Sequence, residues 1–237
     1  MAYGELYPVS WSKIESFQTC ANQYASFRIW RTFQQPEFEQ KQWGTDVHEA
    51  LEHYLMDGTP LGERFKMYQD MMNTLAKIPG EHRGEHKLGV TIDMQPCHYD
   101  DPDCYMRCII DRLVLRAPDG VVLDYKTGKR KDPPSRQLAM SGLITLLNFP
   151  EIQQFHAIFY WTQGGKPSTQ VFTRADIPKL WASFVEDITE MEWAYTHNAF
   201  PARPSGLCGP SSKTPYPGCS VLDCPFNKRK DAHRKKR

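Results

Sequence analysis

The chain has 237 residues, of which 40% are hydrophobic and 24% are charged, as in a globular protein of one elaborated domain. No apolar run approaches the roughly 20 residues that a membrane-spanning helix needs. The first residues also lack the charged-then-apolar order of a signal peptide, so we expect a cytoplasmic protein without membrane association. In that reducing compartment, seven cysteines favour metal or redox chemistry over disulfides.

The formal net charge is only +1, but it is unevenly distributed. Residues 227–237 contain seven Lys or Arg and one Asp, so this segment carries +6 and residues 1–226 carry about −5. A basic segment can bind a phosphate backbone through counterion release. A solvated, flexible tail is an equally simple interpretation, and the two are compatible.

Apolar residues recur at helical spacing in three successive segments. They predict a first helix within 8–33, a second over 43–55 and a third within 60–79. Cys20 falls inside the first of these helices. His48 falls inside the second, where a partly buried structural histidine is the simpler interpretation and a metal ligand is the alternative.

Glu85 opens an extended stretch over 87–94 and is either an active-site acid or a solvated one. Residues 97–108 contain three cysteines, but their spacing matches no common zinc pattern. We therefore expect an ordinary hairpin at this position.

The stretch 109–128 has the strongest chemical signal. Two β-branched runs flank a turn at 118–120, which predicts a hairpin. Each run contains an acid, Asp111 or Asp124, and a carboxylate inside such a strand is costly to bury unless it is paired or binds a metal. Lys126 shares a face with Asp124 because strand side chains alternate. A divalent ion held by carboxylates beside an ammonium suits phosphodiester hydrolysis, whereas an Asp–Lys pair on a surface strand is the alternative.

The following elements complete an alternating pattern. They are a basic loop with Lys129, Arg130 and Lys131, a helix over 135–147 with Gln137 in its first turn, strands over 152–162 and 169–173, and a helix over 175–196. The order strand–strand–strand–helix–strand–strand predicts an α/β sandwich.

The segment 200–226 is rich in Pro and Gly and contains Cys208, Cys219 and Cys224. It has too little regular structure to bury a core, so in a reducing compartment it needs a metal to be ordered. Three cysteines are one short of a tetrahedral thiolate site, and Cys20 is available as the fourth.

Together these segments resemble the RecB-like branch of the PD-(D/E)XK nucleases, which includes phage exonucleases and CRISPR-associated iron–sulfur nucleases. The resemblance covers roughly residues 10–226. The matching motifs are S-x-S-x-I/L-x-x-F-x-x-C at Ser10 to Cys20, G-x-x-x-H-x-x-L-E at Gly44 to Glu52, I-D at Ile110 and Asp111, and D-Y-K-T-G at Asp124 to Gly128. The motif Q-x-x-x-Y is met only by half, because Gln137 is present and Ser141 stands at the tyrosine position.

The resemblance implies a restriction-endonuclease-like fold, with a mixed β-sheet core flanked by helices. It implies one nuclease domain over 1–226, with its core at about 40–197, followed by the basic flexible tail 227–237. A metal cluster would join the N-terminal helix region, 10–30, to the C-terminal cysteine segment, 200–226.

The implied function is that of a metal-dependent DNA exonuclease acting on ends or single strands, in phage-type DNA recombination, repair or replication. If the chain is phage-encoded, its place is the host cytoplasm. The resemblance implies Mg²⁺ or Mn²⁺ on His48, Asp111, Asp124 and the backbone carbonyl of Tyr125, and catalysis by Lys126 with Asp124, Asp111 and Gln137. It also implies a [4Fe–4S] cluster, or zinc, on Cys20, Cys208, Cys219 and Cys224, and it places Ser141 beside the nucleic acid. To these we add Glu85 as a further catalytic acid and, from their charge, Lys129, Arg130 and Lys131 as DNA contacts.

Two other functions remain open. The chain could be the nuclease subunit of a helicase or recombination complex, with a recombination or single-strand-binding protein as partner. It has no G-x-x-x-x-G-K-[ST] loop, so it would not supply the motor. It could also be a non-catalytic nucleic-acid-binding module on the same fold, although the intact acids and lysine argue against this.

Overall fold

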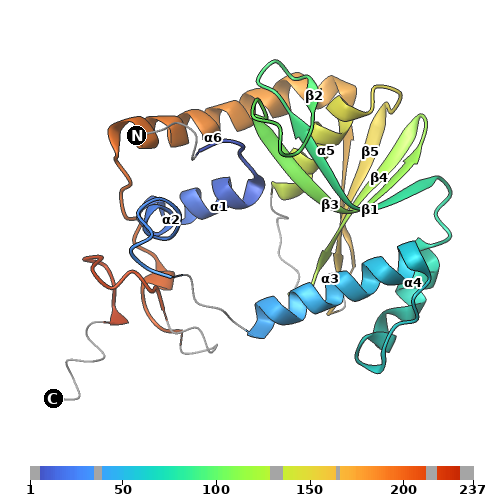
Figure 1. Ribbon diagram of the computed structural model, residues 1–237, viewed down its shortest axis with the longest axis horizontal. Helices are drawn as coiled ribbons and strands as arrows, with labels where there is room; N and C mark the ends of the chain where they lie inside the picture. The colour runs from blue at the N-terminus through green and yellow to red at the C-terminus, as the bar shows by residue number, and fades with distance from the viewer. Residues whose placement is uncertain (1–5, 35–38, 129–135, 164–165, 212–217, 230–237) are drawn as a thin grey trace. The chain divides into compact units, whose positions relative to one another are not determined.

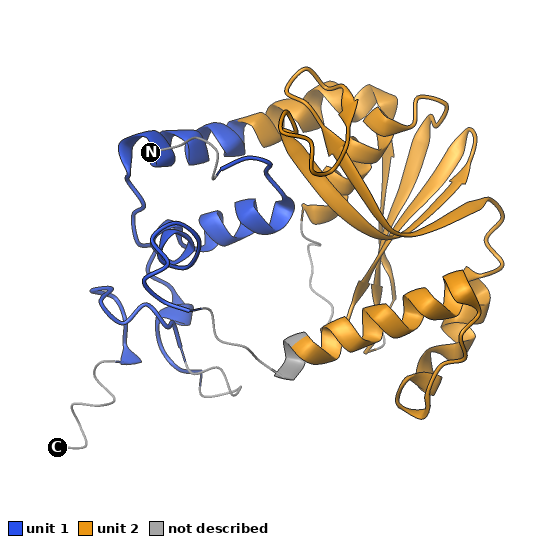
Figure 2. Cartoon of the chain, in the orientation of Figure 1, with its two compact units in different colours: residues 1–37, 186–237 blue, residues 38–185 orange. Residues whose placement is uncertain are grey.

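The computed structural model describes residues 6–34, 39–128, 136–163, 166–211 and 218–229. The chain divides into two compact units: unit 1 consists of residues 1–37 and 186–237, and unit 2 of residues 38–185 (Figure 2). The prediction of one domain over 1–226 stays a prediction. Within the described part of the chain, no helix combines the length and hydropathy that crossing a bilayer requires.

Unit 2 is built on a six-stranded mixed sheet (Figure 1). The strands are β1 (Glu81–Val90), β2 (Pro96–Cys97), β3 (Met106–Arg116), β4 (Asp119–Lys126), β5 (Gln154–Trp161) and β6 (Ser168–Thr173), in the order β2-β1-β3-β4-β5-β6. Of the strands that the structure describes, only β4 and β5 pair in parallel, and α5 (Gln137–Asn148) lies between them in the chain. A parallel pair needs such a crossover, whereas its antiparallel neighbours need only turns. The predicted mixed α/β core flanked by helices is therefore confirmed.

The extended stretch after the third predicted helix begins earlier than expected. β1 already starts at Glu81 and includes Glu85, because residues 81–84 pair with β3 from Leu115 back to Arg112. These residues are too polar to be recognised as a strand. The hairpin expected within 97–108 is formed instead by β1 and β2, and turns link β2 to β3.

The β3–β4 hairpin was predicted correctly, but its turn lies earlier than 118–120. Arg116 pairs with Asp119, so the turn residues are Ala117 and Pro118, and Gly120 already belongs to β4. Gly120 is required for packing instead, since a Cβ there would lie 2.2 Å from the ring of Phe155 on β5.

We expect Gly120→Ala to destabilise the protein by about 1–3 kcal/mol, because the added methyl group overpacks the sheet. Gly62→Ala is the matched control, since a Cβ at Gly62 meets nothing within 4 Å. Urea unfolding of the two variants compares the costs. Equal midpoints would contradict the packing role of Gly120.

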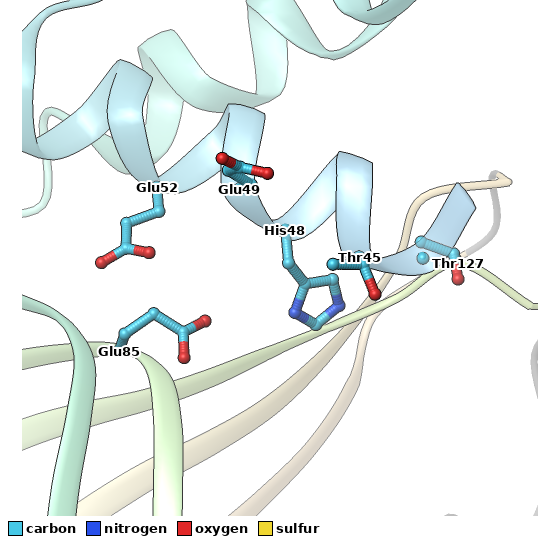
Figure 3. A pocket seen from close by; sticks show the side chains of 7 residues that line it. Thr45, His48, Glu49, Glu52, Glu85 and Thr127 are labelled. Carbon is cyan, nitrogen blue, oxygen red and sulfur yellow. The ribbon is translucent and has the colours of Figure 1, made fainter. Parts of the chain in front are cut away.

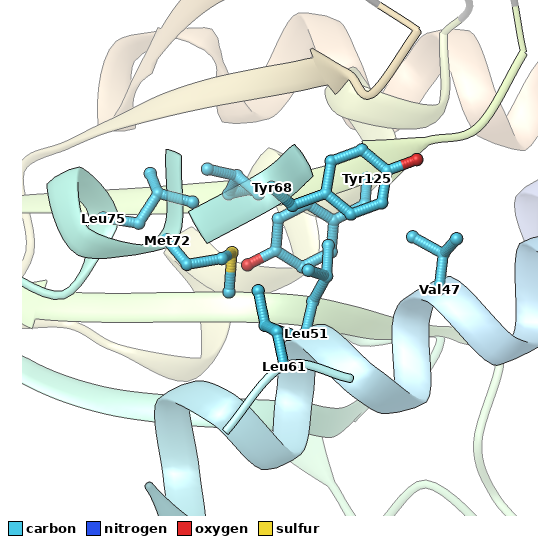
Figure 4. Packing of buried hydrophobic residues seen from close by; sticks show 8 residues of the cluster. Val47, Leu51, Leu61, Tyr68, Met72, Leu75 and Tyr125 are labelled. Atoms are coloured by element: carbon cyan, nitrogen blue, oxygen red, sulfur yellow. The ribbon is translucent and has the colours of Figure 1, made fainter. Parts of the chain in front are cut away.

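One face of the sheet is covered by α3 (Glu39–Asp57), η2 (Glu63–Tyr68) and α4 (Gln69–Leu75). The buried cluster beneath them consists of Val47, Leu51, Leu61, Tyr68, Met72, Leu75, Leu123 and Tyr125 (Figure 4). Burial of these side chains fixes α3 against β4, which carries Tyr125 between Asp124 and Lys126. The helix predicted within 60–79 is in fact η2 followed by α4.

Unit 1 contains α1 (Trp11–Thr19) and α2 (Ala21–Arg28) in place of the single helix predicted within 8–33. The prediction that Cys20 lies inside a helix was wrong. Cys20 is extended, with φ −165° and ψ 107°, and separates the two helices. Further elements are η3 (Arg174–Asp176), α6 (Ile177–His197) and η4 (Gly206–Cys208), and α6 has residues in both units.

Candidate metal centre and active site

Asp111 and Asp124 stand where two neighbouring strands stop pairing. The β3–β4 ladder ends at the pair Arg112–Leu123, and the two aspartates are the next residues beyond it. β4 nevertheless stays paired with β5 as far as Lys126. β3 and β4 therefore separate at Asp111 and Asp124. The gap leaves space between the two carboxylates, which a continuous β3–β4 ladder would not provide.

Three possible ligands from three elements converge at this point. His48 of α3, Glu85 of β1 and Asp111 of β3 each offer a ligand atom, and these atoms all lie within 4.8 Å of one another. His48 Nδ1 lies 3.3 Å from Asp111 Oδ2, and His48 Nε2 lies 2.8 Å from the carbonyl oxygen of Tyr125. The backbone N–H of Tyr125 donates to Asp111 Oδ2 at 2.7 Å. The structure thus brings together three of the four predicted ligands, His48, Asp111 and the Tyr125 carbonyl. Asp124, the fourth, is not in the group of side chains whose ligand atoms all lie within 4.8 Å of one another.

Glu85 reaches the site through an unusual backbone. Its φ is +40°, a left-handed value that non-glycine residues rarely adopt. Gly84 pairs with Arg112 and His86 with Ile110, so Glu85 and Asp111 oppose each other between these pairs. Like charges in this position repel. Burial, followed by the charges of Asp111 and Glu52, raises the pKa of Glu85.

Asp124, Lys126 and Gln137 form a closed polar triangle. Lys126 Nζ lies 2.5 Å from Asp124 Oδ2 and donates to Gln137 Oε1 at 2.8 Å. Gln137 Nε2 donates to Asp124 Oδ1 at 2.5 Å. Burial and repulsion by Asp111 raise the pKa of Asp124 despite the opposing effect of Lys126. Gln137 therefore fixes both the acid and the ammonium.

The donor set fits a hard divalent cation. Carboxylate oxygens suit Mg²⁺ or Mn²⁺, and one imidazole shifts the preference towards Mn²⁺. Asp124 Oδ2 is buried and accepts no hydrogen bond of regular geometry from the described residues, although the Lys126 ammonium is close. A cation here would offset the repulsion among Glu85, Asp111 and Asp124.

An open cavity of about 620 Å³ lies beside these residues (Figure 3). Its described lining consists of Gly44, Thr45, His48, Glu49, Glu52, Glu85 and Thr127. Thr45, Glu49 and Thr127 were not among the site residues predicted from the sequence. Helical spacing could have found the first two, because Thr45 lies three residues before His48 and four before Glu49, and residues at these spacings are neighbours on a helix.

The raised pKa of His48 makes the stability of the metal-free protein depend on pH. Burial opposes its charged form, but the hydrogen bond and charge of Asp111, with the charge of Asp124, raise its pKa from 6.5 to about 9. Protonated His48 therefore stabilises the fold fully below its unfolded pKa, and this contribution is lost as the pH rises through its folded pKa.

In EDTA, we expect the difference in melting temperature between the wild type and His48→Gln to be largest near pH 6. It should vanish near pH 10, which is roughly one pH unit above the pKa of His48 in the folded protein. Differential scanning calorimetry over this range measures the difference. A difference that is independent of pH would show that His48 is not held as an imidazolium.

The four predicted cluster cysteines line one small cavity in unit 1. Amide groups point at three of the sulfurs: Arg203 N donates to Cys20 Sγ at 3.4 Å, Ser205 N to Cys208 Sγ at 3.4 Å, and Gln23 Nε2 to Cys219 Sγ at 3.2 Å. Cys224 lines the same cavity. Burial raises the pKa of the Cys219 thiol, and the neighbouring Cys20 and Cys208 add to the effect.

Of the four predicted DNA-contact residues, the structure describes only Ser141. Lys129, Arg130 and Lys131 lie outside the described residues, as does the tail from residue 230. Ser141 is buried in α5, with 7% of its surface exposed, which leaves little of it for a nucleic-acid contact. Among the described residues, the cysteines of 97–108 belong to no group of three or more possible metal ligands.

No protein-family model matches the sequence, and no curated protein matches it. The fold is similar to the crystal structure of a protein from Eubacterium rectale named "Putative exonuclease". The two chains are 12% identical with a TM-score of 0.50, and the match covers 88% of this chain and 91% of that chain. At this identity, the likeness establishes a shared nuclease-like fold.

Proposed function

We propose that this chain is a metal-dependent DNA exonuclease of the RecB-like PD-(D/E)XK branch. The observation that carries the proposal is the convergence of His48, Glu85 and Asp111 within 4.8 Å beside the Asp124–Lys126 pair. The neighbour's name, which belongs to that protein, is consistent with nuclease chemistry on this fold. The intact acids and lysine favour catalysis over a module that only binds nucleic acid.

Each side chain has a distinct role in phosphodiester hydrolysis. His48, Asp111, Asp124 and the Tyr125 carbonyl would hold Mg²⁺ or Mn²⁺, with Glu85 beside them. When bound, the ion lowers the pKa of a water and neutralises charge on the phosphate. The Lys126 ammonium stabilises the negative charge that develops on the phosphate oxygens, and Gln137 keeps it in position.

Digestion of linear DNA labelled at either end tests the proposed activity. Single- and double-stranded forms, with an RNA of the same sequence, are incubated with Mg²⁺, Mn²⁺ or EDTA. We expect release of short products from DNA ends with either metal and none in EDTA. Absence of cleavage under all conditions would refute the proposed function.

We also propose that Cys20, Cys208, Cys219 and Cys224 bind a [4Fe–4S] cluster, with zinc as the alternative. The amide donors at the sulfurs support thiolates, which accept such hydrogen bonds in cluster sites. Among the described residues, no three of these sulfurs lie within 4.8 Å of one another, whereas a tetrahedral zinc site with bonds of about 2.3 Å would bring them closer. This spacing favours the cluster over a single zinc ion.

A role in phage-type recombination, repair or replication, a recombination or single-strand-binding partner, and a cytoplasmic location stay predictions. They follow from the resemblance of the sequence motifs. Copurification of the full chain with a helicase would favour the subunit alternative.

A further inference from the structure

The cavity beside the candidate metal centre has two chemically different ends (Figure 3). Thr45 and Thr127 give one end neutral hydroxyl groups. Gly44 has no side chain there, and a Cβ in its place would lie 3.3 Å from Oγ1 of Thr127. This end adjoins Lys126, the residue before Thr127 in the chain. His48 lies between the two ends in the view of Figure 3.

The other end of the cavity is acidic. Glu52 projects from α3 and Glu85 from β1 into the space between these two elements, and the Glu85 carboxyl group extends towards His48 in Figure 3. Glu52 also lies against the backbone of Gly84, where a Cβ would be 3.1 Å from its Oε1. Glu49, one turn before, adds a third carboxylate, and no described lining residue is Lys or Arg.

These carboxylates discriminate between the groups that a nucleic-acid strand can present. A phosphate is negatively charged and offers acceptor oxygens, so it is repelled by carboxylates, which also only accept hydrogen bonds. A terminal sugar hydroxyl is uncharged and can donate to a carboxylate. The acidic end therefore tolerates the last nucleoside of a strand and opposes a backbone that continues through it.

We propose that Glu49 and Glu52 are the residues that set end specificity: the cavity receives a strand terminus that bears a hydroxyl and disfavours one that bears a phosphate. This inference rests on the proposed nuclease function. Neither residue belongs to the group of three possible ligands that lie within 4.8 Å of one another. Their role is to select the terminus, while the cation and Lys126 act on the phosphodiester.

The test compares two forms of one labelled single-stranded oligonucleotide, with a hydroxyl or a phosphate at the end that the protein degrades. A circular single strand of similar composition is included. The wild type, Glu49→Gln/Glu52→Gln and the control Glu151→Gln are assayed with Mn²⁺. Glu151 is an exposed acid in the turn after α5, outside the cavity.

We expect the wild type and the control to degrade the hydroxyl end about tenfold or more faster than the phosphate end, and to leave the circle intact. In the double variant, this ratio falls towards one, and cleavage of the circle becomes measurable. Mn²⁺ binding, followed by electron paramagnetic resonance, is expected to be retained in the double variant.

Equal rates on both ends in the wild type would overturn the inference, as would a ratio that the double substitution leaves unchanged. Loss of Mn²⁺ binding in the double variant would also overturn it, because the two acids would then hold the ion. In all three cases, cleavage by the wild type keeps the proposed nuclease function standing. Only a wild type that cuts none of the substrates removes that function.

Discussion

Replacing Lys126 with Met is expected to abolish DNA cleavage while leaving the fold and DNA binding largely intact. Lys126 Nζ lies 4.8 Å from the ring centroid of Phe159, so an aliphatic chain of similar length keeps this packing. What is lost is the ammonium next to Asp124 and Gln137. Removing one preorganised group that stabilises transition-state charge costs roughly 10²–10³-fold in rate.

The rate is measured on labelled DNA under Mn²⁺, with thermal unfolding as a check on folding. Lys77→Met serves as the control, because Lys77 is exposed and lies in the turn after α4. We expect wild-type rates for this control. Retained cleavage in a pure Lys126→Met preparation would remove the proposed role of Lys126.

Substitution of Cys219 by Ser is expected to remove bound metal. We also expect it to lower the free energy of unfolding by several kcal/mol, as loss of a structural metal does. The segment around Cys219 has little regular structure of its own, and its described elements are short. A metal would join it to Cys20, which is distant in sequence. Without that bond, the segment must be ordered by a few local contacts, such as those from the Asn227 side chain to the carbonyls of Cys219 and Val221.

Metal content and the visible absorption of anaerobically purified protein measure this effect, together with the melting temperature. Cys97→Ser is the control, because Cys97 lies in β2 and outside the cavity. A Cys219→Ser protein with unchanged colour, metal content and stability would exclude the joining role. If the purified wild type contains zinc and no iron, the site binds zinc in place of the [4Fe–4S] cluster.

The sequence predicted the sheet, and it singled out most of the residues that the structure brings close together at the candidate site, because each signal was local. Alternation placed Asp124 and Lys126 on one face, and helical spacing placed His48 and Glu52 together. The hairpin then brought Asp111 opposite Asp124, one residue beyond its last ladder pair. Such relations depend on neighbouring residues and short turns, which pattern alone can specify.

Other features depended on contacts between distant segments. No residue in the segment 8–33 signals that Cys20 is extended, because apolar residues recur at helical spacing on both sides of it. The left-handed backbone of Glu85 depends on its place opposite Asp111 of β3. Gly120 looked like a turn residue, but it is required by the Phe155 ring of β5, the residue with which it pairs. Tertiary packing decided each of these positions.

The most direct test of the account is a Mn²⁺ titration, followed by electron paramagnetic resonance, of the wild type and of Asp111→Asn. Asp111 accepts from Tyr125 N and lies 3.3 Å from His48, so the amide variant keeps the shape of the site and loses its charge. We predict saturable Mn²⁺ binding by the wild type that is lost or strongly weakened in Asp111→Asn. Equal binding by both proteins would contradict a cation held between α3, β1 and β3.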